Sequence, residues 1–292
     1  MFDILLYAVT SLLYAALGWH FWNTRWRVGA EAAGGDDAAG GDDATGVASW
    51  ERLAILAPFL LHSYLLYAEL FAAPELRFGF SQALSVMLWL TVLIYWAESL
   101  FYDVKGMQAL VLPLAAVCAL LPAFFAGPET PAYTHTFQFR AHLLVAMLAY
   151  SLFTIAALHA ALMAVLERRL RGGKFAGPSG ESLAGPWASL PPLMTLEALL
   201  FRILTLGFVL LTLTLGTGFV FSEELFGKAV RFNHKTVFGI MSWFIFGALL
   251  VGRYGWGWRG RTALRWTLAG FITLLLAYVG SMFVLQVILG KV

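Results

Sequence analysis

The chain has 292 residues, of which 60% are hydrophobic and only 12% are charged, and its mean hydropathy is +0.77. A soluble protein of this length carries roughly twice that charged fraction, so the composition excludes a soluble globular domain. The net charge of +2 gives no indication of nucleic-acid binding, and the single cysteine excludes an intramolecular disulfide, an iron–sulfur cluster and a C-x-x-C-H haem attachment site.

Eight apolar stretches follow one another along the chain, each near the length of about 20 residues that crosses the hydrocarbon core of a bilayer. We predict membrane spans at about 2–22, 51–72, 80–102, 107–127, 141–166, 196–221, 234–252 and 265–289. The sequence therefore predicts an all-α membrane protein, a bundle of about eight transmembrane helices. These helices form a single integral membrane domain over residues 1–292.

Lysine and arginine are concentrated in the connections that follow the first, third, fifth and seventh spans. Because positively charged connections stay in the cytoplasm, we predict that both termini face outward, into the periplasm. Residues 23–50 and 172–192 are then cytoplasmic linkers. The first contains the repeated sequence AAGGDDAAGGDD, Ala32 to Asp43, whose composition cannot bury a core. The chain is predicted to be a multi-pass protein of the bacterial inner (cytoplasmic) membrane, in contact with the lipid bilayer.

Three histidines are candidate site residues, because ionisable groups within a membrane are costly and often mark a site. His142 opens the fifth span and His234 opens the seventh, and both spans begin on the predicted outer side. Neutral imidazole is a common iron ligand, and histidines on facing helices hold haem in helical bundles. Their spacing alone leaves open a second reading, in which each imidazole faces water or a loop carbonyl.

His62 lies near the middle of the second span, about 16 Å from its start at the rise of an α-helix. Glu69 follows at i+7 on the same helix face. A ligand role and a hydrogen bond to another helix remain equally open for His62.

Several motifs in the second half of the chain resemble a known family. The stretch from Ala141 to His159, AHLLVAMLAYSLFTIAALH, is similar to the helix of the CcsA-type cytochrome c assembly proteins that begins with an outer-face haem histidine. More closely, four motifs resemble the YpjD-like inner-membrane branch of that superfamily. They are PPLMTLE (191–197), LTLTLGTG (211–218), HKTVFG (234–239) and the basic turn GWRGR from Gly257. The resemblance covers residues 140–289 well and the first four spans loosely.

The resemblance implies that the protein handles haem for covalent attachment to apocytochromes c, and that His142 matches an outer haem histidine. Other parts of the family pattern are missing. FGKAVRFNHK stands in place of the tryptophan-rich haem-docking segment, Val251 in place of an intramembrane histidine, and no histidine follows the last span. His234 lies where the docking segment would end and could supply a ligand of a different arrangement.

We therefore predict a haem-binding, haem-handling accessory factor of cytochrome c assembly that is not an enzyme. Its cofactor would be a non-covalent b-type haem on His142 and His234, with His62 as a further binding residue. Apocytochrome c or other assembly proteins would be its partners. One alternative is a polytopic transporter or channel component in which His62 and Glu69 line a polar path. Another is a membrane scaffold whose histidines are structural only.

Overall fold

A computed structural model describes residues 2–27, 49–72, 77–101, 106–128, 136–171, 193–226 and 233–290. Every regular element in these segments is helical, so the predicted all-α class is confirmed. The linkers predicted at 23–50 and 172–192 lie largely outside the described residues, as does the Ala32–Asp43 repeat. The first helix continues through Arg27 as a π-helical turn, so it is longer than the predicted span.

The helices follow the apolar stretches of the sequence. The first half of the chain forms α1 (Phe2–Phe21) with η1 (Trp22–Arg27), α3 (Ser49–Tyr67) with η3 (Ala68–Ala72), α4 (Phe80–Phe101) and α5 (Gln108–Phe124). The second half forms α6 (Phe137–Arg171), α7 (Leu193–Phe226), α8 (His234–Trp256) and α9 (Gly260–Leu275), which continues as η5 (Leu276–Gly280), α10 (Ser281–Phe283) and η6 (Val284–Ile288). Of these described segments, 7 are long and apolar enough to cross a membrane, and α5 is a shorter apolar helix. The structure is thus that of a polytopic membrane protein.

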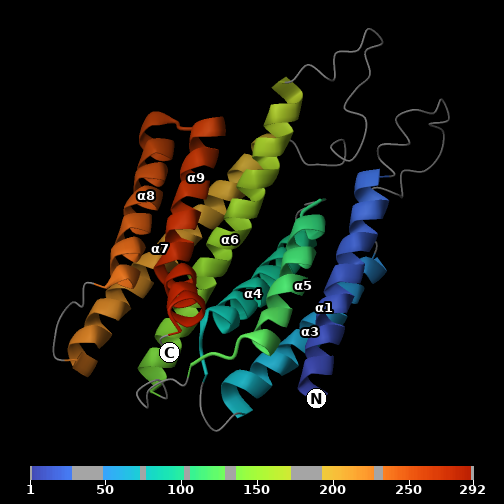
Figure 1. Cartoon of the computed structure of the whole chain (residues 1–292). Coiled ribbons are helices and arrows are strands. Elements are labelled where there is room, and N and C mark those ends of the chain that lie inside the picture. The colour runs from blue at the N-terminus through green and yellow to red at the C-terminus, as the bar shows by residue number, and fades with distance from the viewer. Residues whose placement is uncertain are drawn as a thin grey trace.

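The helices form one bundle in which α1, α3, α4 and α5 lie together and α6 to α9 lie beside them (Figure 1). Helix α6 joins the two groups, since it packs against α4 on one side and against α7 and α9 on the other. The first and last parts of the chain lie at the same end of the bundle, and the turn between α8 and α9 lies at the opposite end (Figure 1). We call these the terminal end and the turn end. Which compartment each end faces stays a prediction.

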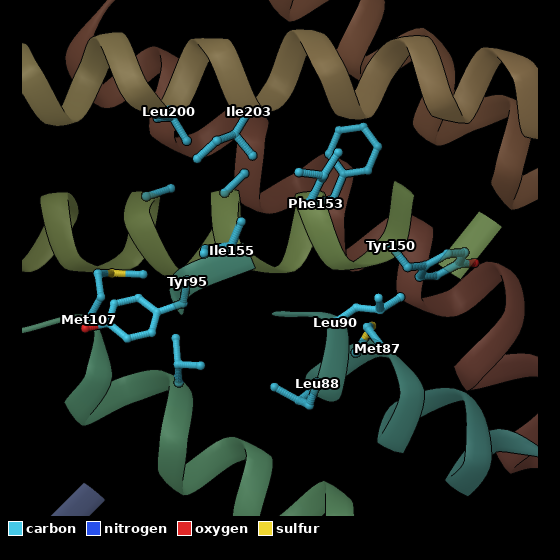
Figure 2. Packing of buried hydrophobic residues seen from close by; sticks show 14 of the residues in the cluster. Met87, Leu88, Leu90, Tyr95, Met107, Tyr150, Phe153, Ile155, Leu200 and Ile203 are labelled. Atoms are coloured by element: carbon cyan, nitrogen blue, oxygen red, sulfur yellow. The ribbon is translucent and has the colours of Figure 1, made fainter. Parts of the chain in front are cut away.

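Helix α6 lies at the centre of the bundle, in contact with α4, α7 and α9. Every residue from Ala149 to Ala157 is buried, as expected for a helix surrounded by others. Figure 2 shows Phe153 and Ile155 of α6 near Leu200 and Ile203 of α7, with residues of α4 on the other side. The core therefore continues from α4 through α6 to α7.

Small residues let the central helices approach closely, as in other membrane bundles. The rings of Phe153 on α6 and Phe246 on α8 stack with centroids 3.9 Å apart. A Cβ added to Gly207 of α7 would lie 3.2 Å from the Phe153 ring, and one added to Gly270 of α9 would lie 2.8 Å from the Phe246 ring. The two glycines thus border a stacked pair of rings that joins all four helices of the second half.

Candidate functional site

His142 lies one turn into α6 at the terminal end, where its half-buried ring faces α7. Its Nδ1 is 2.8 Å from Thr217 Oγ1, and its ring meets the Phe221 ring edge-on with centroids 6.1 Å apart. A Cβ on Gly218 would lie 3.4 Å from His142 Cε1, so this glycine leaves room for the imidazole. Because Nδ1 of His142 is hydrogen-bonded to Thr217, Nε2 is the ring nitrogen that could bind a ligand. A hydrogen bond on one ring nitrogen is the usual way to orient the other toward a metal.

His234 is the first residue of α8 at the same end of the bundle, and it is exposed. The residue before it, Asn233, caps the helix, since its side chain accepts a hydrogen bond from the Thr236 backbone amide at 3.0 Å. The next residue, Lys235, packs over the Tyr278 ring at 4.9 Å. No hydrogen bond or ring contact joins the imidazoles of His142 and His234, both of which the structure describes. That His142 and His234 bind one shared ligand stays a prediction.

His62 is fully buried between α1, α3 and α4. Its Nε2 is 2.8 Å from Ser85 Oγ on α4, and its ring meets the Tyr14 ring of α1 edge-on with centroids 5.8 Å apart. Two buried polar atoms of this contact, His62 Nδ1 and Tyr14 Oη, have no hydrogen-bond partner among the residues that the structure describes. His62 does not line the cavities that lie between α3, α4 and α6, between α1 and α5, or between α6 and α9. Its contacts are those of an interhelical hydrogen-bonding residue.

Tyr7 of α1 also contacts Glu69 of η3, the turn that continues α3. Tyr7 Oη donates to Glu69 Oε2 at 3.2 Å, and Gln82 Nε2 of α4 donates to Glu69 Oε1 at 2.7 Å. Tyr7 and Tyr14 are seven residues apart on α1, as are His62 of α3 and Glu69 of η3, which continues α3. We call these four residues the α1–α3 seam. The matching i+7 spacing of two tyrosines on the first span was the sequence signal that could have identified the partners of His62 and Glu69.

An apolar cavity of about 300 Å³ lies between α3, α4 and α6 near the terminal end. Tyr67, Phe71 and Trp89 contribute aromatic rings to its lining. Arg140, an exposed residue of α6, lies at this cavity with its guanidinium 5.9 Å from the centre of the Phe71 ring. Arg140 and His142 are about 200° apart around α6. The cavity and the imidazole therefore lie on different faces of the helix.

A second apolar cavity, of about 550 Å³, follows the contact between α1 and α5, and Ser11, Gly18 and Pro113 are among its lining residues. Within the described part of the chain, no group of three or more histidine, cysteine, aspartate or glutamate side chains could hold a metal ion.

Comparison with known proteins gives one family and several relatives. The family model described as cytochrome C assembly protein matches residues 50–289. The inner membrane protein YpjD of Escherichia coli is 37% identical over 147 residues, which cover 50% of this chain and 52% of the relative. The cytochrome c biogenesis protein CcsA of Gloeobacter violaceus is 34% identical over 92 residues, 32% of this chain and 27% of CcsA. The chain thus matches about half the length of the first of these relatives. No solved structure matches the chain.

Proposed function

Because this chain belongs to the cytochrome c assembly protein family, we propose that it handles haem at the terminal end of its bundle as an accessory factor of cytochrome c assembly. It is a multi-pass protein of the inner membrane. Its cofactor is a non-covalent b-type haem, which it delivers on the outer face, and its partners are apocytochrome c or other assembly proteins. The protein has no synthase activity of its own, since the tryptophan-rich segment of the family is replaced before His234.

The observation that carries the proposal is the geometry of His142. This residue lies within the matched region, near the start of a helix, with Nδ1 on the Thr217 hydroxyl and the opposite nitrogen left for a ligand. Haem would supply an iron to which this nitrogen could bind. Thr217 would fix the direction of the ring, and Phe221 would cover one edge of it. His234, exposed at the start of α8, is the candidate for the second ligand.

The test is a reduced-minus-oxidised absorbance spectrum of the protein purified in mild detergent. We expect a b-type spectrum for the wild type, and weaker binding with a change toward five-coordinate iron for His142→Ala and His234→Ala. His20→Ala is the matched control, because that imidazole lies at the far end of α1 beside Glu51. Thr217→Val should retain haem but shift the haem absorbance bands, because the hydrogen bond that orients the His142 ring is lost.

Two results would contradict the proposal. A wild-type protein that carries no haem and takes up none when haem is supplied would exclude haem binding. Wild-type haem with unchanged spectra in both histidine variants would place the ligands elsewhere, with His62 next to be replaced. If His62→Ala instead lowers haem content and leaves the spectrum unchanged, His62 acts in loading and not in ligation.

The α1–α3 seam favours a second candidate, a transport path for protons or small cations. A hydrogen bond joins Tyr7 to Glu69, and the rings of Tyr14 and His62 meet edge-on at another depth of the same helix pair. His20 Nε2 lies 3.4 Å from Glu51 Oε1 at the other end of that pair. A path of this kind predicts pH equilibration across proteoliposomes, followed with an enclosed pH-sensitive dye. Glu69→Gln should abolish it. Equal rates for the wild type, the variant and empty liposomes would reject this candidate.

A further inference from the structure

A third cavity, at the turn end, is lined mainly by charged residues. It has a volume of about 210 Å³ and lies between the last turns of α6 and the first turns of α9. We call it the arginine pocket; its lining residues are Ala164, Glu167, Arg168, Arg261, Leu264, Arg265 and Leu268. On α9 the lining residues follow the i, i+3, i+4, i+7 spacing of one helix face, and on α6 they follow i, i+3, i+4. Two helix faces therefore converge on this space.

The arginine pocket has an excess of positive charge. Arg261 is paired, with its Nε 3.2 Å from Glu167 Oε1. Neither Arg168 nor Arg265 makes an ion pair with any carboxylate that the structure describes. Arginine presents several N–H donors in a plane and matches the oxygens of a phosphate. The pocket therefore has two guanidinium groups available for one anion.

The polar and apolar residues of the pocket are arranged by depth. Arg261 and Arg168 lie near the turn end, because α9 begins and α6 ends there (Figure 1). Leu264 and Arg265 follow at about 5–6 Å below Arg261 along α9, and Leu268 lies about 10 Å below it, at 1.5 Å per residue. On α6, Ala164 lies deeper than Arg168. A phospholipid has the same order, with its phosphate at the surface and its acyl chains below.

A cluster of tryptophans places the pocket at the membrane surface. The rings of Trp258 and Trp266 lie with centroids 5.4 Å apart, and Trp256 lies 6.3 Å from Trp258. Trp266 directly follows Arg265 on α9. Tryptophan is enriched at the level of the lipid headgroups. The arginines beside this cluster therefore lie at the depth of the phosphates.

We propose that the arginine pocket binds the headgroup of an anionic phospholipid from the adjoining leaflet. The phosphate lies between Arg168 and Arg265, and the acyl chains run along the deeper Ala164 and Leu268. Basic pockets between transmembrane helices bind anionic headgroups in this way. Arg261 is held by Glu167 and forms the wall of the pocket. The site is independent of the haem proposal, since it lies at the opposite end of α6 from His142.

The test is a titration of the full-length, delipidated protein in non-ionic detergent with phosphatidylglycerol or phosphatidylcholine, with the first bound lipid counted by native mass spectrometry. We expect tighter binding of phosphatidylglycerol. Each arginine near an anionic headgroup should strengthen binding by about fivefold, so Arg168→Gln and Arg265→Gln should each lose about that factor. Arg265→Lys should lose less than Arg265→Gln, because a lysine retains the charge.

The matched control is Arg259→Gln, which removes one charge at the same end but outside the pocket, where Arg259 Nε lies 3.5 Å from Glu197 Oε1. This variant should bind phosphatidylglycerol as the wild type does. An equal loss in the control would show general attraction to a charged surface and overturn the proposal. Equal affinity for the two lipids would overturn it as well. Displacement of the lipid by millimolar inorganic phosphate would identify a free phosphate as the occupant instead.

Discussion

Replacing Gly270 with alanine should destabilise the bundle at one identifiable contact. The added Cβ would lie 2.8 Å from Cε1 and Cζ of Phe246, whereas ordinary contacts lie at 3.4–4 Å, so the ring must move by at least about 0.6 Å. Phe153 is stacked on the same ring at 3.9 Å, and Gly207 lies close to Phe153 in turn, so the ring has little space to move. Overpacking of this kind costs about 1–3 kcal/mol.

The control separates this overpacking from helix propensity. Alanine is favoured over glycine in a helix by about 0.5–1 kcal/mol, and this gain accompanies the overpacking in Gly270→Ala. Gly216 of α7 is also helical, but a Cβ there meets nothing within 4 Å. Gly216→Ala should therefore be neutral or stabilising. The difference between the two variants should equal the overpacking cost, about 1–3 kcal/mol.

The measurement is unfolding in mixed micelles of a mild detergent and sodium dodecyl sulfate, followed by circular dichroism. A double-mutant cycle with Phe246→Leu identifies the contact: this substitution should cost less in the Gly270→Ala protein than in the wild type, with a coupling above about 0.5 kcal/mol. If Gly270→Ala proves as stable as Gly216→Ala, or if the cycle shows no coupling, the reasoning from this close approach is wrong.

Three further predictions concern topology, the first linker and an ion pair. In a Cys118→Ala background, the cysteine of Ser179→Cys should resist a membrane-impermeant thiol reagent applied to spheroplasts, and that of Glu223→Cys should react. The reason is that arginine and lysine mark the cytoplasmic connections. The reverse pattern would overturn the orientation. Deletion of residues 32–43 should leave expression and haem content unchanged, because a solvated loop adds little closure cost with length; loss of membrane insertion would contradict this. Replacing Arg253 with methionine should destabilise the protein by about 3–5 kcal/mol in the same unfolding assay. The substitution leaves the carboxylate of Glu197, a residue that is 8% exposed, without its hydrogen-bonded partner. A loss below about 1 kcal/mol would show that water or Arg259 replaces that partner.

The sequence by itself determined the fold class and the existence of the helices. Runs of apolar residues near 20 in length cannot remain in water, and a helix is the element that satisfies its own backbone inside a bilayer. The basic connections predict the orientation for the same kind of reason, because moving arginine across a membrane is costly. His142 could be singled out because it opens a span and matches a family motif. Each of these inferences rests on properties of one segment at a time.

Only the tertiary structure decided which face of each helix meets protein. In a soluble helix the apolar face is the buried face, but lipid is as apolar as a protein core, so hydropathy does not distinguish them. Nothing in the sequence indicated that α6 is central, or that its histidine meets the Thr217 hydroxyl. His62 of α3 and Glu69 of η3 both contact α1 and α4, but these partners come from other segments of the chain. The arginine pocket likewise exists because α6 and α9, a hundred residues apart in sequence, pack side by side.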